Sequence, residues 1–275
     1  MEPEDIKNHW RDWSVTHGTS LRATTKTPTA KEMEIDALTR AFRRIVDAPE
    51  ATGRVLEVGC GNGQNCLRLA GVFPALNFTG VDYIGEMVAA AMAVRDAAGI
   101  DASRLDFHED DAMVLGAVDG QFDIVFTDRC LINFNTDDLQ KQAISTIAER
   151  IVPGGHLIMI ENSQQTYGRQ NRARELLGLE PRSPAEFNHF FDEEVILPHL
   201  EELGLHVLDI EDFLSLHDLA LYVLVPAING GVVDYDHPLV EAAMRLNIGL
   251  SNTMPDGLGA LGQNRLYFCR KSAGA

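Results

Sequence analysis

The sequence contains few of the residues on which small secreted proteins and metal sites depend. It has four cysteines among 275 residues, and no two of them have the C-x-x-C spacing of a zinc or redox site. A chain of this length needs no disulfide bonds to hold its core together. The polar run Asp234-Tyr235-Asp236-His237 is typical of a loop. We therefore expect free thiols, a reducing compartment and no bound metal.

Positive charge and long apolar runs are also scarce. The chain has 23 Lys and Arg against 41 Asp and Glu, a net charge of -18, which repels nucleic acids and anionic membranes. The longest uncharged apolar run, Leu219 to Ile228, is too short to span a bilayer, and the acidic N-terminus lacks the apolar segment of a signal peptide. We expect a cytoplasmic protein that acts on a small molecule and binds neither nucleic acid nor membrane; a homodimer is left open.

From Arg54 onwards, short apolar runs alternate with helical segments, which is typical of a parallel sheet with crossover helices. The predicted strands are 55–58, 78–82, 105–108, 122–127 and 156–161. The predicted helices are 64–72, 85–98 and 137–151, the last capped by Thr136. Pro153-Gly154-Gly155 predicts a sharp turn before the fifth strand. This pattern predicts an α/β fold.

The two ends of the chain follow other patterns. Residues 1–50 predict a short helix carrying Trp10 and Trp13, a loop, and an amphipathic helix from the capping-box pattern at 29–32 to about Val46, which should lie on the core. We interpret this segment as a helical lid over a main domain of residues 51–275. Within that domain, 192–203 predicts a helix, 205–210 and 265–269 predict strands, and 162–190 and 212–262 are irregular insertions.

A glycine-rich segment directly follows the first predicted strand, Glu57-Val58-Gly59-Cys60-Gly61-Asn62-Gly63. Glycines let a backbone turn tightly against a ligand, and the following helix offers free N–H groups. A dinucleotide site requires G-x-G-x-x-G/A, but Gln64 stands where its third small residue belongs. The carboxylate of Glu57 should face incoming N–H or ammonium groups, so a cationic ligand fits better than a pyrophosphate.

An acidic residue ends the second predicted strand, in Gly80-Val81-Asp82-Tyr83-Ile84. Asp82 lies 19 residues beyond Gly63, close to the distance at which an acid binds ribose hydroxyls in nucleotide sites. An Asp at such a position is otherwise a helix cap, but we favour the ribose role after this glycine loop.

These segments together resemble the class I S-adenosylmethionine (SAM)-dependent methyltransferase family over residues 54–161. The glycine segment is similar to its first motif, Asp82 with Tyr83 to its ribose-binding segment, and His108-Glu109-Asp110-Asp111-Ala112 to the segment that contacts adenine. Residues 122–128 and 151–156 resemble its fourth strand and the turn before its fifth. The resemblance implies SAM as cofactor, S-adenosylhomocysteine (SAH) as product, and a doubly wound seven-stranded sheet of order 3-2-1-4-5-7-6 with the last strand antiparallel.

Several further residues are candidates for the site. Asp128, Arg129 and Asn133 follow the fourth strand, at the edge where such sheets bind ligands; we assign Asp128 and Arg129 to the cofactor and Asn133 to the substrate. In similar methyltransferases an N-terminal segment closes over the cofactor. Trp13 would then contact substrate and Arg22 would pair with the SAM carboxylate; alternatively, the tryptophans anchor a surface helix that Arg22 caps.

Two histidines in irregular segments, His17 and His189, are candidate general bases because imidazole titrates near neutral pH. The other interpretation is that no base is needed, since the sulfonium is already activated and positioning supplies much of the rate. Residues 187–194, 210–213 and 235–238 also resemble bacterial enzymes of surface-sugar or secondary-metabolite pathways. We expect methyl transfer to O or N of a small molecule, with a nicotinamide-dependent oxidoreductase or a non-catalytic SAM-binding regulator as alternatives.

Overall fold

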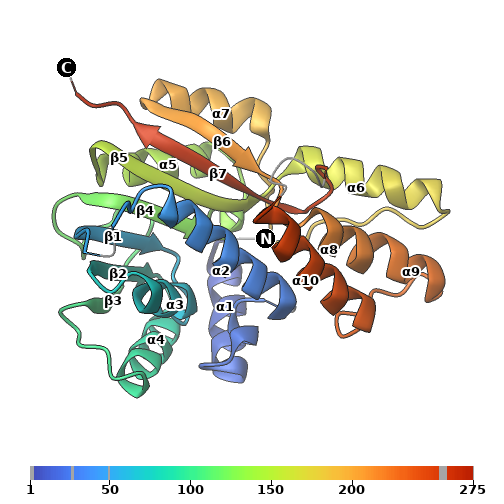
Figure 1. Ribbon diagram of the computed structural model, residues 1–275, viewed down its shortest axis with the longest axis horizontal. Helices are drawn as coiled ribbons and strands as arrows, with labels where there is room; N and C mark the ends of the chain where they lie inside the picture. Colours follow the sequence, from blue (N-terminus) through green and yellow to red (C-terminus); the bar gives the residue numbers. More distant parts are fainter. Residues whose placement is uncertain (1–2, 26–27, 49, 254–258, 275) are drawn as a thin grey trace.

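A central seven-stranded sheet organises the computed structural model, which describes residues 3–25, 28–48, 50–253 and 259–274 (Figure 1). Parts of two expected loops, residues 26–27 and 254–258, lie outside the described ranges. The strands are β1 (Gly53–Val58), β2 (Leu76–Asp82), β3 (Leu105–Glu109), β4 (Phe122–Asp128), β5 (Ile151–Asn162), β6 (Leu205–Glu211) and β7 (Asn264–Lys271).

The strand order is β3-β2-β1-β4-β5-β7-β6. Strands β1 to β5 are parallel, and β7 runs antiparallel to both β5 and β6. The predicted order and the reversed last strand are therefore confirmed. Because the order reverses between β1 and β4, the carboxyl ends of these two strands open the crevice in which such sheets bind ligands.

Helices cover both faces of the sheet because alternate residues of each strand point to opposite sides. On one face, Phe126 packs with buried residues of α2 (Pro28–Arg43), α3 (Gln64–Val72) and α4 (Gly85–Ala97). On the other face, Val125 packs with residues of α5 (Asp137–Glu149) and α7 (Glu193–Glu202). Thr136 caps α5 through the Leu139 N–H at 3.2 Å, as predicted.

The N-terminal segment contains two helices of different kinds. Helix α1 (Pro3–His17) is followed by the short 3-10 helix η1 (Leu21–Ala23), whereas α2 packs into the main core through Leu38 and Phe42. The predicted capping box is wrong, because α2 already begins at Pro28 and the Thr29 hydroxyl instead lies 2.9 Å from Nε2 of His217. The prediction that this second helix lies on the core is confirmed.

The segment Pro153-Gly154-Gly155 does not form a turn ahead of the fifth strand. Strand β5 begins at Ile151, which pairs with Phe122, and the register with β4 shifts before His156 pairs with Ile124. Gly154 adopts a φ of 78° inside this irregularity. The three residues therefore form a bulge within β5, and α5 ends at Glu149, two residues before the predicted end.

The two segments predicted to be irregular both contain helices. Residues 162–190 contain α6 (Gln164–Leu176), and 212–262 contain α8 (Ser215–Leu219), the π-helix η3 (Ala220–Leu224), α9 (Val225–Ile228) and α10 (Pro238–Ser251). The buried residues of α6 are Thr166, Tyr167, Gln170 and Arg174, so its buried face is polar and gives no apolar period. In Figure 1, α6, α8, α9 and α10 lie together beyond one end of the sheet.

Within the described residues, no helix combines the length and apolar composition needed to cross a membrane. The same part of the chain contains no group of three or more His, Cys, Asp or Glu side chains that could hold a metal ion.

Candidate functional site

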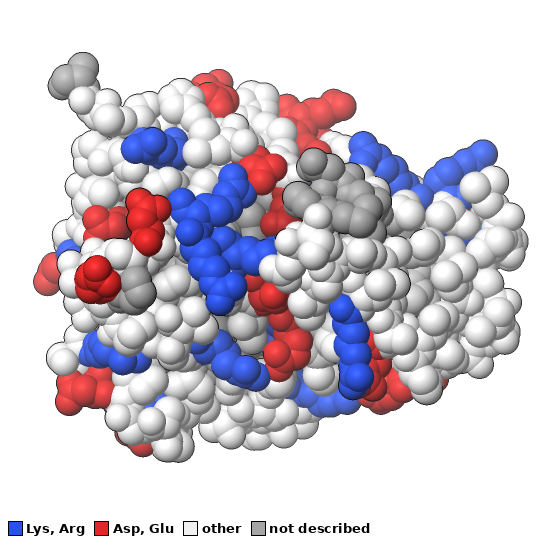
Figure 2. Space-filling view, viewed as in Figure 1, with Lys and Arg blue, Asp and Glu red and all other residues white. Residues whose placement is uncertain are grey.

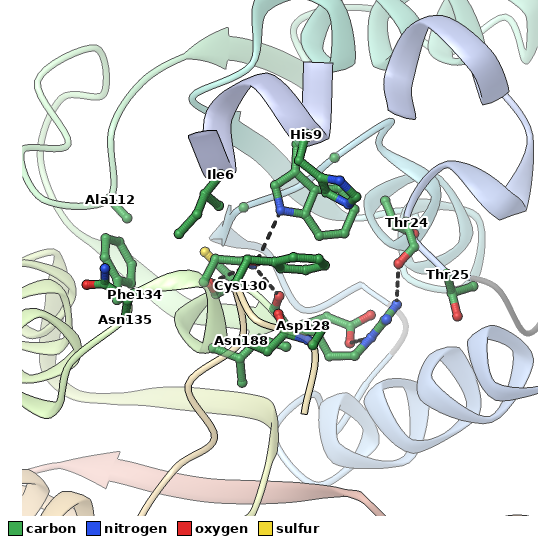
Figure 3. A pocket seen from close by; sticks show the side chains of 18 of the residues that line it. Ile6, His9, Thr24, Thr25, Ala112, Asp128, Cys130, Phe134, Asn135 and Asn188 are labelled. Carbon is green, nitrogen blue, oxygen red and sulfur yellow. Dashed lines mark hydrogen bonds and ion pairs between the residues drawn. The ribbon is translucent and has the colours of Figure 1, made fainter. Parts of the chain in front are cut away.

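A cavity of about 570 Å³ opens at the carboxyl ends of β1, β2 and β4. This volume lies within the usual range for small-molecule and cofactor sites. Helix α1 lies along one side of the cavity, and the loop after β4 lies opposite (Figure 3). The predicted site residues that line it are Trp13, Gly59, Gly61, Asp82, Tyr83, Asp111, Ala112, Asp128, Arg129 and Asn133.

Two glycines of the loop after β1 hold a backbone shape that brings the chain against its neighbours. Gly59 and Gly61 have φ values of 76° and 52°, a region that side chains disfavour. A Cβ on Gly59 would collide with Cys130 Sγ, and one on Gly61 would lie 2.6 Å from Cγ2 of Thr24. The loop is therefore a cradle that only glycine can form.

Gly63 has a packing role, which corrects its assignment to the cofactor. It does not belong to the cavity lining, and a Cβ there would lie 2.7 Å from Cζ of Phe107 and 2.8 Å from Cβ of Ala91. Gly63 is the N-cap residue of α3 and has a φ of 76°. Because it has no side chain, α3 can lie close to α4 at this point.

The carboxylate of Asp82 connects the ends of β1 and β2. It accepts hydrogen bonds from the Gly61 N–H at 2.8 Å and the Ile84 N–H at 3.0 Å. Burial raises its pKa to about 6, against the effect of these two N–H donors. Each carboxylate oxygen can accept more than one hydrogen bond, so Asp82 keeps capacity for ligand hydroxyls.

The segment after β3 supplies another wall of the cavity. Asp111 Oδ1 accepts the Met113 N–H at 2.9 Å, which fixes the turn, and Ala112 and Met113 both line the cavity. Tyr83 lies at the same end, under the ammonium of Lys7 on α1 at 5.4 Å.

A buried ion cluster lies beneath the loop after β4. Lys31 Nζ is 2.5 Å from Asp128 Oδ2 and 2.9 Å from Glu34 Oε2, and Arg129 Nε is 2.9 Å from Glu34 Oε1. Burial alone would raise the pKa of Asp128, but the charges of Lys31 and Arg129 outweigh it and lower this pKa. The cluster therefore holds Asp128 ionised at the cavity wall.

One oxygen of Asp128 is left without a hydrogen bond among the described residues. Asp128 Oδ1 is buried, and Arg129 Nε lies 3.7 Å away. Arg129 itself donates from Nη2 to the Thr24 carbonyl at 2.9 Å. An ionised acceptor with unused capacity at a cavity wall suits a cationic donor group.

Glu57 lies behind the loop, which corrects the expectation that it faces the ligand. It is 1% exposed, does not belong to the cavity lining, and accepts hydrogen bonds from Asn65 Nδ2 at 2.7 Å and Cys66 Sγ at 3.0 Å. Burial raises its pKa to about 8. The ionised acid at the wall is therefore Asp128, while Glu57 supports the loop.

Arg22 and His17 border a different hollow, on the outer side of the lid segment. Both line a second pocket together with Asp234 and Asp236. The Arg22 guanidinium lies 3.3 Å from Asp236 Oδ1, and the His17 ring packs on Trp13 with centroids 4.6 Å apart. Neither belongs to the lining of the main cavity, so the geometry does not support a cofactor contact for Arg22 or a base role for His17.

His189 also lies outside the cavity lining. Its Nε2 is 2.7 Å from Asp137 Oδ1, and its backbone N–H donates to the Ile132 carbonyl. This residue connects the loop after α6 to α5, so its assignment as a base is not supported. The histidine that does line the cavity is His9 on α1, which stacks 5.8 Å from Trp13.

Aromatic side chains form the outer part of the cavity. Trp10 Nε1 donates to Asn133 Oδ1 at 3.0 Å, which joins α1 to the loop after β4. In Figure 3, Ile6 extends from α1 towards Cys130. Trp10 lies edge-on to Phe187 at 5.9 Å, and both line the cavity.

Sequence reasoning missed several residues of this site, among them Lys31, Glu34, Tyr167, Arg182 and Tyr222. The burial of Lys31 could have been predicted from the sequence, because Lys31 lies one helical turn before Ile35 on the predicted apolar face of the second helix. Tyr167, Arg182 and Tyr222 had none, since they belong to segments whose helices show no apolar period.

Comparison with known proteins finds methyltransferases among the sequences and structures similar to this chain. Residues 55–155 match the family model described as a methyltransferase domain. A curated relative, demethylmenaquinone methyltransferase from Deinococcus radiodurans, is 30% identical over 125 residues, which is 44% of this chain and 49% of that protein. Ajmaline N-methyltransferase from Rauvolfia serpentina is 33% identical over 91 residues, 33% of this chain and 31% of that protein. The chain thus spans about half, or less, of these relatives.

A solved structure supports the fold over nearly the full length. The N-methyltransferase NodS from Bradyrhizobium japonicum, in complex with SAH, has a TM-score of 0.58 at 15% identity and covers 97% of this chain and 99% of its own.

Proposed function

Because residues 55–155 match the family model of a methyltransferase domain, we propose that this chain is a class I, SAM-dependent methyltransferase that transfers the methyl group of SAM to an oxygen or nitrogen nucleophile of a small molecule. The observation that carries the proposal is the shared cavity. The glycine cradle and the acidic ends of β2 and β4 line its inner part, and aromatic residues of α1 and of 187–190 line its outer part. Donor and acceptor would meet inside one enclosed space.

The inner lining fits SAM by its chemistry. We assign Asp82 to the ribose hydroxyls and Asp111 with the Ala112 amide to adenine, with Tyr83 beside them. The unsatisfied Oδ1 of Asp128 suits the ammonium group, and Gly59 and Gly61 allow close approach of the methionyl chain. Arg129 is our candidate for the carboxylate, in place of Arg22.

Bound SAM would supply a methyl group already activated by its sulfonium. The chain's own residues then have to orient the acceptor and exclude water, which can supply a large part of the rate. Asn133 lines the cavity and is held there by the Trp10 indole and by its own hydrogen bonds to the Arg129 and Cys130 carbonyls. We assign it to positioning of the acceptor.

The acceptor class follows in part from the relatives. Their names refer to a quinone precursor and an alkaloid, and the aromatic outer wall supports a natural-product intermediate more than a sugar. The free cysteines, three of them buried, support a reducing cytoplasmic location.

Cofactor binding can be tested by titrating SAH into the protein by calorimetry and by comparing melting temperatures with SAM and with NADH. We expect SAM and SAH to bind and NADH to have no effect. Asp82→Ala should weaken SAH binding about tenfold or more, since a hydrogen bond to a charged group contributes about 1.5–3 kcal/mol. Stabilisation by NADH alone would overturn the proposal in favour of an oxidoreductase.

Turnover can be tested with methyl-labelled SAM and pooled metabolite extracts. Transfer of label to a small molecule, with matching SAH release, is the expected result. SAH binding without transfer to any fraction would support the non-catalytic regulator instead.

A further inference from the structure

Two aromatic groups face the outer part of the cavity. Trp10 and Phe187 form one of them, and Tyr167 with Phe190 forms the other, with their ring centroids 5.0 Å apart at an edge-on angle. Tyr222, on the π-helix η3, adds a fifth ring to these four. We call this region the acceptor chamber. Its rings offer flat apolar surfaces to a flat apolar ligand.

Arg182 places a positive charge in the wall of the acceptor chamber. Its guanidinium lies over the Tyr222 ring at 3.5 Å, Nη1 donates to Gln170 Oε1 at 2.7 Å, and Nη2 donates to Gln263 Oε1 at 3.3 Å. These acceptors are neutral, and no carboxylate in the described ranges lies within 4.0 Å of the guanidinium nitrogens. Two of the five N–H donors are used, which leaves three for a ligand.

Arg129 differs from Arg182 because its charge is paired with a carboxylate of the protein, whereas that of Arg182 is not. Arg129 also lines the cavity, but its charge is matched by Glu34 at 2.9 Å. The acidic residues of the lining, Asp82, Asp110, Asp111 and Asp128, all come from the ends of β2 and β4 and the segment after β3. The inner part is therefore rich in negative charge and suits a cationic group. The acceptor chamber carries the positive charge of Arg182 and suits an anionic group.

A buried hydroxyl lies beside this guanidinium. Tyr167 is 6% exposed, its hydroxyl makes no hydrogen bond within the described residues, and its ring centroid lies 5.3 Å from the Arg182 guanidinium carbon. A buried hydroxyl without a partner costs free energy, so a ligand oxygen beside Arg182 would relieve that cost.

We propose that the methyl acceptor is a flat aromatic molecule with a carboxylate, which binds to Arg182 and the Tyr167 hydroxyl while its rings pack among Trp10, Phe187 and Tyr222. The proposal rests on the proposed function, because it assigns the second substrate of the same cavity. Arginine suits a carboxylate because its planar fork can donate two parallel hydrogen bonds.

The test uses calorimetric titration of the full chain at saturating SAH with three probes. 3-Hydroxy-2-naphthoate is aromatic and anionic, 3-hydroxy-2-naphthamide is aromatic and neutral, and glucuronate is anionic without a ring. We expect the naphthoate to bind about tenfold or more tightly than the amide and than glucuronate, the range for a charge-assisted contact.

The variants assign the preference to individual groups. Arg182→Gln should reduce the naphthoate-to-amide ratio to about one while SAH still binds, and Tyr167→Phe should lower naphthoate affinity severalfold. Arg172→Gln is the matched control, because Arg172 is an exposed arginine of α6 whose partner is Glu175; it should keep the full ratio.

Each other outcome overturns a separate statement. If SAH does not bind, the proposed function fails. If SAH binds but the naphthoate does not, or the amide binds equally well, or Arg182→Gln keeps the preference, the carboxylate assignment is wrong. Tighter binding of glucuronate than of naphthoate would replace the aromatic acceptor by a sugar acid.

Discussion

Two buried carboxylates beside the glycine loop differ in what surrounds them. Glu57 has only an amide and a thiol as partners, and burial raises its pKa to about 8. Asp128 has Lys31 and Arg129, whose charges lower its pKa. At neutral pH Glu57 therefore keeps its proton and Asp128 does not, although both lie near the carboxyl ends of neighbouring strands.

We predict that Glu57→Gln reduces the loss of stability with rising pH. Glu57 has an ordinary pKa of 4.5 in the unfolded chain and about 8 in the folded one, so between these values the folded state holds a proton that the unfolded state releases. The free energy of unfolding of the wild type should therefore fall as pH rises through this window, by about 1.4 kcal/mol per pH unit for this group.

Urea unfolding at about pH 6, 7 and 8 measures this effect. The stability of Glu57→Gln relative to the wild type should rise by about 2 kcal/mol over the series. Glu32→Gln serves as control, because Glu32 lies on the solvent-accessible side of α2 beside Arg68, and its stability difference should stay constant. A constant difference for Glu57→Gln as well would contradict a buried, protonated Glu57.

At the level of single residues, the sequence predicts those site residues whose position is set by the path of the backbone alone. Gly59, Gly61, Asp82, Asp111 and Asp128 follow strand ends, so strand order alone brings them to one edge. The direction of a side chain, and its contacts with residues far away in the sequence, could not be predicted. Glu57 turns behind the loop, and Arg22 pairs with a residue more than 200 positions away; no local pattern encodes either.

Helix α1 buries one large aliphatic side chain, Ile6, and otherwise reaches the rest of the molecule through polar and aromatic contacts. Trp10 donates to Asn133, Arg11 lies 3.5 Å from Glu86, and Lys7 lies over Tyr83. By contrast, α2 is anchored by buried apolar residues and by the Lys31 ion cluster. The two helices of the first 50 residues therefore differ in attachment, and we propose that the lid comprises α1 and η1, with α2 part of the main domain.

We predict that SAH binding protects α1 from trypsin. Lys7 and Arg11 are the cleavage sites within this helix, and ligand under the helix would stabilise its closed position. Cleavage at these sites, followed by mass spectrometry, should slow about fivefold or more with saturating SAH. Cleavage at Arg172 on α6 should not change. Equal rates at Lys7 and Arg11 with and without SAH would show that α1 is no lid.

Among whole elements, those with an apolar face were predicted and those with a polar buried face were missed. Helix α3 matches its predicted bounds because its apolar residues recur at helical spacing. Most strands agree within a few residues because the central ones are short, almost continuously buried apolar runs. Helix α6 buries Thr166, Gln170 and Arg174, and α10 buries Asn247. The partners of these polar groups, such as the Leu261 and Phe213 carbonyls, are distant in sequence.

The molecule as a whole has a strong net negative charge, and ion pairs form locally between its basic and acidic side chains. In Figure 2, Lys and Arg side chains gather in the middle of one face among acidic ones, and the lobe over α8 to α10 is mostly uncharged. Arg40 of α2 pairs with Glu211, and Arg44, directly after α2, pairs with Asp209; both acids belong to β6. The remaining excess of acids gives a net charge of -18, and self-repulsion of this kind opposes the folded state.

We predict that salt stabilises the chain at alkaline pH. Raising NaCl from about 50 mM to about 500 mM shortens the screening length to a few ångströms and weakens the repulsion. The melting temperature at about pH 8 should rise by a few degrees. Near the isoelectric point, about 4.8, the same salt step should have little effect. A fall in melting temperature at pH 8 would show that the ion pairs outweigh the repulsion.

The π-helix η3 has a consequence for how the acceptor chamber could arise. It spans Ala220–Leu224 between α8 and α9 and carries Tyr222. A π turn holds one residue more than an α turn, so it is related to a regular helix by a single-residue insertion. Deleting one residue here would restore an α-helical turn and change the directions of the side chains within it. Because Tyr222 lies within this turn, such a change would alter how its ring lies beneath the Arg182 guanidinium.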